Sequence, residues 1–210
     1  MHLPQADAQL VQILIEQTDA ALADAARRAG PWLVCKPGCS QCCHGAFALN
    51  ALDAARLREG MEKLRADNPA LAATVEKRAQ GWIAEYGPDF PGSLQTGLLG
   101  ESEPERDRFE EFANDAACPA LDPVTGCCDL YAARPMTCRV FGPPVHMQQD
   151  EESGLGCCEL CFVGASDEQI ADCELAVPHD LEASILSAMD AKGETVVAFA
   201  LVGLGRGMER

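Results

Sequence analysis

The chain has 210 residues, of which 48% are hydrophobic, and its 33 acidic and 16 basic side chains give a formal net charge of −17. This length fits one domain, or a helical domain with a modest appendage, and the hydrophobic share is enough for a core. The hydrophobic share argues against a metallothionein-like chain, because such a chain consists mostly of cysteine and has no core. The acidic balance repels phosphate backbones and anionic lipids, so we expect neither nucleic acid nor a membrane as a partner.

The first seven residues do not have a basic region followed by an apolar core, so we expect no signal peptide. The longest apolar stretch, 195–204, is too short to span a bilayer. These features predict a cytoplasmic protein, in which disulfides are scarce. The chain nevertheless has 12 cysteines. Cysteines in such a setting indicate metal binding or catalysis and not a disulfide framework.

Helical periodicity and capping residues predict most of the regular structure. The first helix, 5–29, is amphipathic and is ended by Gly30-Pro31, after which 32–34 should run extended and buried. Asn50 should cap a second helix that runs to about residue 65, and Asn68-Pro69 should open a third that carries Trp82 and Tyr86 in the core.

Residues 87–102 are rich in Gly and Pro and should form a surface loop, followed by a polar helix over 104–114. Ser166 and Asp180 can cap two further helices, and 195–204 favours a last helix. We therefore expect a mainly α fold with little β structure, as a single domain over 1–210. Its helical scaffold would be 5–115 and 166–210, and its irregular cysteine-rich metal-binding lobe 32–46 plus 115–165.

Four sulfurs occur within nine residues at Cys35, Cys39, Cys42 and Cys43. A C-x2-C pair such as Cys39 and Cys42 lets one turn of backbone supply two ligands of a tetrahedral thiolate site. Neighbouring side chains point apart, so Cys42 and Cys43 either serve two metal ions or divide their roles between a cluster and packing.

The second group of cysteines surrounds a predicted tight turn at 122–126. A hairpin there would place Cys118 beside Cys128. The residue before Pro135 is restricted to an extended conformation, so we expect a break at Arg134-Pro135 and Cys138 on a new segment after it. Arg134 and Arg139 stand out in so acidic a chain. They are predicted to donate hydrogen bonds to ligand sulfurs, the alternative being ordinary surface ion pairs.

Three cysteine-containing blocks of the sequence together resemble a known family. Cys35-x3-Cys39-x2-Cys42-Cys43, then Cys118-Pro119-x-Leu121 and Cys128-x-Leu130-Tyr131, then Arg134-Pro135-x2-Cys138-Arg139-x-Phe141, resemble the bacterial cysteine-cluster family. Its CxxCxxCC domain is described as zinc- or iron-chelating, and it includes a flagellin lysine-methylase branch. The resemblance covers about 32–145 and implies metal binding. The sequence departs from the pattern by one extra residue between the first two cysteines and by the extra Cys127.

The last group contains a further C-x2-C pair, Cys158 and Cys161, which we expect to be ligands. The choices between Cys127 and Cys128, and between Cys157 and Cys158, remain open at this point. Cys173 is expected to be a small buried apolar side chain. Where cysteines suffice, His44 and His146 are expected to be bystanders.

The main functional hypothesis is a metal-binding protein that holds zinc or iron through thiolates, possible forms being zinc ions or an iron–sulfur cluster. One alternative is a metal- or S-adenosylmethionine-dependent enzyme such as a protein-lysine methylase. The triad Cys35, Cys39 and Cys42 has radical-enzyme spacing, but Gln41 replaces the expected aromatic residue and the chain lacks alternating strands and helices. The other alternative is a thiol redox sensor or metal chaperone.

Overall fold

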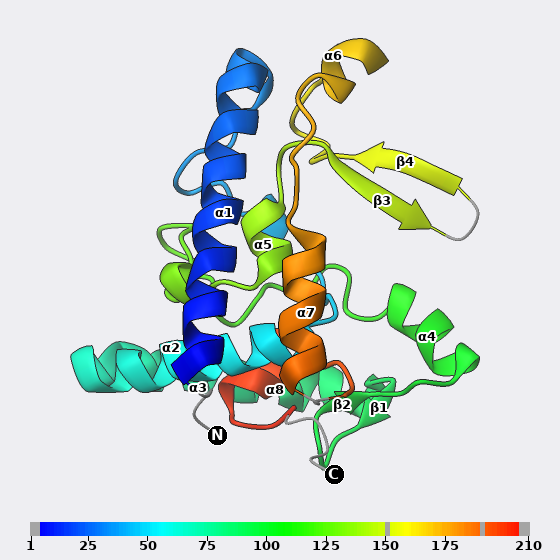
Figure 1. Ribbon diagram of the computed structural model, residues 1–210. Coiled ribbons are helices and arrows are strands. Elements are labelled where there is room, and N and C mark those ends of the chain that lie inside the picture. The colour runs from blue at the N-terminus through cyan, green and yellow to red at the C-terminus, as the bar shows by residue number, and fades with distance from the viewer. Residues whose placement is uncertain (1–4, 150–151, 190–191, 206–210) are drawn as a thin grey trace. The chain divides into compact units, whose positions relative to one another are not determined.

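The computed structural model describes residues 5–149, 152–189 and 192–205 (Figure 1). Helices account for 54% of the structure and strands for 8%, so the prediction of a mainly α fold is confirmed. The chain forms two compact units, which we call the first unit (1–36 with 136–188) and the second unit (37–135 with 189–210). The grouping of 1–210 into one domain stays a prediction.

The first unit is built on one long helix. Its elements in chain order are α1 (Gln5–Ala29), the 3-10 turn η1 (Gly30–Trp32), α5 (Met136–Val140), the antiparallel hairpin β3 (Val145–Gln149) and β4 (Glu152–Gly156), α6 (Asp167–Ala171) and α7 (His179–Met189). The short α5 lies beside α1, as Figure 1 shows. Arg139 of α5 donates to the carboxylate of Asp19 of α1 at 2.5 Å.

The helix α1 has one buried stripe, as its predicted amphipathic character requires. Val11, Leu14, Thr18 and Ala25 are buried at helical spacing, whereas Leu10 is 38% exposed. Thr18 satisfies its hydroxyl by donating to the Leu14 carbonyl at 2.8 Å. The segment after α1 differs from the prediction, because residues 30–32 form a 3-10 turn and Val34 is 49% exposed.

The second unit has a core of three helices. Its elements are η2 (Gln41–Cys43), α2 (Ala51–Asp67), α3 (Pro69–Tyr86), η3 (Gly87–Asp89), the two-residue strands β1 (Gly92–Ser93) and β2 (Leu98–Leu99), α4 (Glu103–Glu110), η4 (Tyr131–Ala133) and α8 (Val197–Leu201). Apolar residues of α2, α3 and α8 form the main core together with Leu49, Ala120 and Leu130. This core supports the cysteine-bearing segments.

Both predicted asparagine caps are confirmed. The Asn50 side chain accepts the N–H of Asp53 at 3.0 Å, and that of Asn68 accepts the N–H of Leu71 at 3.2 Å. The last helix is shorter than predicted, because Thr195 pairs with Leu49 in an antiparallel bridge and cannot join a helix. The predicted loop over 87–102 contains the β1–β2 hairpin.

The aromatic side chains of α3 pack in a second apolar cluster of the same unit. Trp82 is 8% exposed and meets Phe112 edge to face, with ring centroids 5.8 Å apart. The ring centroid of Tyr86 lies 5.1 Å from that of Trp82, and Tyr86 packs against the same cluster. The prediction that these aromatics belong to the core is therefore confirmed for Trp82, whereas Tyr86 packs half-buried against the core. Within the described ranges, no helix is long and apolar enough to cross a membrane.

Candidate metal centre

The two units divide the cysteines into two sets. Cys39, Cys42, Cys43, Cys118, Cys127 and Cys128 belong to the second unit, and Cys35, Cys138, Cys157, Cys158, Cys161 and Cys173 belong to the first. None of these twelve cysteines, all of which lie among the described residues, forms a disulfide. This division of the cysteines is the main feature that the structure adds to the sequence analysis.

A hairpin brings two segments of the second unit together, as predicted. Leu121 and Cys128 form an antiparallel bridge, and the Asp122 N–H donates to the Cys127 carbonyl at 2.8 Å. The Asp122 carboxylate accepts from the Thr125 hydroxyl at 2.6 Å, which closes the turn. The hairpin thus holds the start and end of the 118–128 segment close together.

Residues 37–43, which we call the first cysteine loop, are held against this hairpin by backbone hydrogen bonds. The N–H of Cys118 donates to the carbonyl of Cys43 at 2.7 Å, and His44 forms an antiparallel bridge with Ala117. Cys42 and Cys43 lie in η2, where their side chains hydrogen-bond to each other. This contact differs from the expectation that neighbouring cysteine side chains point apart.

The thiols of Cys42, Cys43, Cys118 and Cys128, which we call the hairpin cluster, are close enough to change one another's acidity. The hydrogen bond from Cys43, aided by the Arg134 charge, lowers the pKa of Cys42 to about 6. The same hydrogen bond, then burial and the charges of the other three thiols, raise the pKa of Cys43. Burial raises the pKa of Cys118 to about 12 and also raises the pKa of Cys128. Repulsion by Cys128 adds to the rise at Cys118, and repulsion by Asp129 and Cys42 adds to the rise at Cys128.

Two arginines supply positive charge to the hairpin cluster. Arg134 stacks over the Tyr131 ring at 4.1 Å, and its charge helps to lower the pKa of Cys42 and opposes the burial that raises the pKa of Cys128. Arg78 of α3 donates to the Leu121 carbonyl at 2.7 Å and pairs with Asp129, and its charge opposes the burial that raises the pKa of Cys118. The sequence predicted that Arg134 would donate hydrogen bonds to ligand sulfurs. Arg78 lies in the middle of α3 and belongs to no motif, so the sequence did not indicate it.

Arg139 occupies a different environment. It lies in the first unit, where its guanidinium is 6% exposed and pairs with Asp19. Arg139 therefore forms an ion pair in which the arginine is buried and the Asp19 side chain is 48% exposed, and its hydrogen bond to a ligand sulfur stays a prediction.

Two further cysteines flank the hairpin cluster. Cys39 is half-buried in the loop after Gly38, which packs against the hairpin turn. Cys127 is exposed, and its thiol lies 3.8 Å from the carbonyl oxygen of its neighbour Thr125. Of the adjacent pair, Cys128 and not Cys127 interacts with the other thiols of the cluster.

In the first unit, Cys35 and Cys161 lie together with their sulfurs 3.9 Å apart. Cys158 and Cys161 are buried in an apolar cluster with Phe162 and Cys173, as expected for Cys173. Burial and the charge of Cys161 raise the pKa of the exposed Cys157. Cys138 lies on α5 in the same unit.

The cysteine clusters are not closed metal sites. Among the residues that the structure describes, no three His, Cys, Asp or Glu side chains are already arranged to hold a metal ion. Thiolates are nevertheless the ligands that zinc and iron–sulfur clusters prefer, and several thiols converge in each unit. The type of donor atom therefore fits a metal, and the thiols of Cys42, Cys43, Cys118 and Cys128 lie close enough to change one another's acidity.

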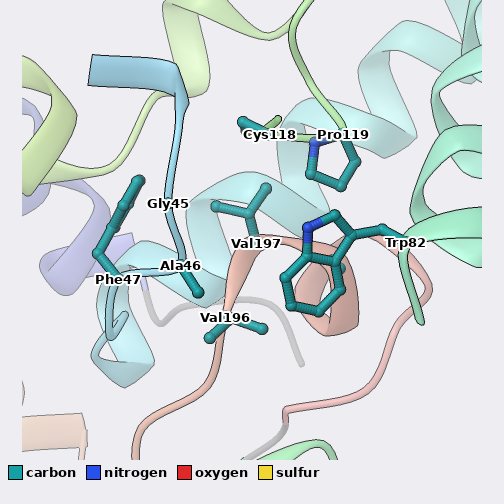
Figure 2. Close-up of a pocket in the computed structure, with 9 residues that line it drawn as sticks. Gly45, Ala46, Phe47, Trp82, Cys118, Pro119, Val196 and Val197 are labelled. Atoms are coloured by element: carbon teal, nitrogen blue, oxygen red, sulfur yellow. The ribbon is translucent and has the colours of Figure 1, made fainter. Parts of the chain in front are cut away.

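A small pocket lies beside the hairpin cluster (Figure 2). Trp82, Pro119 and Val197 line it together with Cys118 and residues of the 45–47 and 196–198 segments. Its interior offers about 10 Å³, which is room for roughly one water molecule. This pocket therefore cannot hold an organic cofactor such as S-adenosylmethionine.

A family model matches a large part of the chain. The family model CxxCxxCC, described as "Putative zinc- or iron-chelating domain", matches residues 34–161, which is more than half of the chain. No curated protein and no solved structure matches the chain significantly. The matched range contains every cysteine except Cys173.

Proposed function

The chain belongs to the CxxCxxCC family of zinc- or iron-chelating domains, and on that premise we propose that the hairpin cluster holds zinc or iron through cysteine thiolates. The observation that carries the proposal is the convergence of Cys42, Cys43, Cys118 and Cys128 from three separate segments of one unit. When bound, the metal would cross-link the first cysteine loop to the hairpin.

The electrostatics of the cluster support this role. The pKa values of Cys43, Cys118 and Cys128 are raised, in part by the charges of neighbouring thiols, which opposes the loss of all four protons in the metal-free protein. A divalent cation reverses this repulsion, because coordinated thiols lose their protons outright. Arg134 and Arg78 then offset part of the negative charge that a four-thiolate centre would carry.

Metal analysis of protein purified without oxygen tests the proposal. We expect zinc or iron in the wild type, and its loss from the hairpin cluster in the double variant Cys118→Ser/Cys128→Ser. A colourless protein with zinc would indicate a structural or Lewis-acid site, and a brown one with acid-labile sulfide an iron–sulfur cluster. Wild-type protein that contains neither metal would contradict the proposal.

A cytoplasmic location, and the absence of nucleic acid and membrane partners, remain part of this proposal. They follow from the acidic balance of the chain and from its thiol content.

A further inference from the structure

The first unit contains two cysteines whose sulfurs lie close together. We infer that Cys35 and Cys161, which we call the dithiol pair, form a redox-active site that reacts with an organic disulfide carrying uncharged, apolar substituents. This site uses residues of the first unit only and does not depend on the metal centre proposed for the second unit.

The geometry of the dithiol pair carries the inference. The Sγ atoms of Cys35 and Cys161 are 3.9 Å apart, close enough for a hydrogen bond between the two thiols. An S–S bond is about 2.05 Å long, so its formation requires an approach of roughly 2 Å, which is within the reach of a side-chain rotation. The two thiols are therefore placed to join in an intramolecular disulfide.

The two thiols differ in their access to solvent, and this difference assigns their roles. Cys35 is exposed, whereas Cys161 is only 4% exposed and belongs to an apolar cluster with Phe162 and Cys173. An external reagent reaches the exposed thiol first. Cys35 is therefore the attacking thiol. Cys161 is the resolving thiol, which reacts with a disulfide already formed on Cys35.

The backbone holds the turn that carries Cys161 against the segment that leads to Cys35. The Phe162 N–H donates to the Trp32 carbonyl at 3.0 Å, and the Phe162 side chain is buried. Phe162 has a φ of +58°, in the left-handed region that disfavours residues other than glycine. Such a conformation persists where the surrounding contacts impose it, so the resolving thiol is held in place.

A third segment completes the support of the dithiol pair. Gly142 leaves room for the Cys35 sulfur, since a Cβ atom added to Gly142 would lie 3.0 Å from it. The Gly142 carbonyl also accepts the N–H of Cys158 at 3.2 Å, and the Cys158 carbonyl accepts the N–H of Cys161 at 2.8 Å. Three segments distant in sequence thus meet at the pair.

The same three segments indicate the kind of substrate. Each of them has a large, exposed apolar side chain, namely Val34, Phe141 and Leu160. Exposed apolar side chains that gather at one place mark a binding surface, whereas scattered ones do not. The net charge of −17 also disfavours anionic reagents. An uncharged, apolar disulfide therefore fits this site better than an anionic one such as oxidised glutathione.

The reaction consists of two exchanges in which atoms and electrons balance. Cys35 loses its proton to solvent, and its thiolate attacks one sulfur of the substrate RS–SR. A bond forms between Cys35 and that sulfur, the RS–SR bond breaks, and the departing thiolate takes up a proton. Cys161 then loses its proton and attacks the Cys35 sulfur, which forms the intramolecular disulfide and releases the second RSH. The dithiol pair loses two electrons, and the substrate gains them.

Peptide mapping of the full chain, purified without oxygen, tests the inference. Dithiodipyridine, an uncharged aromatic disulfide, should convert the pair to a Cys35–Cys161 disulfide, and a reductant should restore both thiols. Cys127, an exposed thiol of the second unit, is the internal control and should retain the probe as a mixed disulfide. A stable mixed disulfide on Cys35 would overturn the inference, and so would a Cys35 that reacts only after a chelator removes bound metal.

Variants separate the roles of the two thiols. Cys161→Ala should stop after the first exchange, with the probe retained on Cys35. The matched control is Cys157→Ser, which removes an exposed neighbouring thiol and should form the intramolecular disulfide as the wild type does. Cys118→Ser/Cys128→Ser should form it too, so this inference and the proposed function fail separately. Release of the probe from Cys161→Ala at the wild-type rate would contradict the role of Cys161.

Reaction rates test the substrate class. The rate of Cys35 with dithiodipyridine and with oxidised glutathione is divided by the rate of N-acetylcysteine with the same reagent. This ratio should be about tenfold higher for the uncharged reagent. Equal ratios would overturn the assignment of the substrate.

Discussion

Gly126 lies so close to Gly38 that a Cβ atom added to Gly126 would come within 2.6 Å of the Gly38 carbonyl oxygen. Gly126 also has a φ of +69°, in the left-handed region that disfavours other residues. This close contact joins the first cysteine loop to the hairpin turn and depends on the absence of a side chain.

Gly126→Ala should therefore lower the free energy of unfolding by about 1–3 kcal/mol, from backbone strain and from the clash with Gly38. Urea denaturation measures the change. The matched control is Gly81→Ala, because Gly81 lies within α3 with open space around its Cα. That change should stabilise the protein by roughly 0.5–1 kcal/mol. Equal effects of the two substitutions would contradict the close contact.

Cys127 and Cys128 should differ in their effect on metal content. Cys128→Ser should reduce the metal bound at the hairpin cluster, because Cys128 interacts with Cys42 and Cys43. Cys127→Ser should have no effect, because Cys127 is exposed and lies outside that set. Elemental analysis of both variants decides between them, and loss of metal from Cys127→Ser alone would reverse the assignment.

The thiol of Cys42 should be unusually acidic in reduced, metal-stripped protein. Its pKa is lowered from 9.0 to about 6, so the unfolded chain binds more protons between these values. The contribution of this group to stability is therefore complete above about pH 9 and is lost as the pH falls through about 6. Alkylation of Cys42, followed by peptide mass spectrometry, should show a midpoint near pH 6 in the folded protein.

Two variants show where that acidity originates. Cys43→Ala removes the hydrogen bond, which is the largest cause, and should move the Cys42 midpoint upward towards its ordinary value. Arg134→Gln removes a smaller cause and should move it less. A Cys42 midpoint that stays the same in Cys43→Ala would contradict the hydrogen bond.

Arg78→Ala should destabilise the second unit by roughly 3 kcal/mol. Arg78 is 23% exposed and Asp129 is 14% exposed, so the substitution leaves a mostly buried carboxylate without its partner. The matched control is Arg65→Ala, whose pair with Glu76 is more exposed, and about 1 kcal/mol or less is expected there. Thermal unfolding of both variants measures the difference, and a loss for Arg78→Ala no larger than that of the control would contradict the account.

Local signals in the sequence predicted the elements well. Asn50 and Asn68 identified two helix starts, because a cap is a contact between near neighbours in the chain. The tight turn at 122–126 likewise identified the hairpin that pairs Leu121 with Cys128. The end of the chain was less predictable, because the pairing of Thr195 with Leu49 joins distant residues and shortens α8.

The sequence predicted which residue type forms the candidate site, but not how the cysteines are divided between the two units. Spacing identified the cysteines, but their division between units depends on backbone contacts such as that of Phe162 with Trp32. Arg78 was missed for a similar reason, since a helical arginine far along the chain has no sequence signal that relates it to Cys118.

X-ray absorption of the metal in the anaerobically purified wild type tests the central claim most directly, because it measures the ligand atoms themselves. If cysteine thiolates hold the metal, the first shell consists of sulfur at about 2.3 Å from the ion. A first shell of nitrogen and oxygen at about 2.0–2.1 Å would contradict the account.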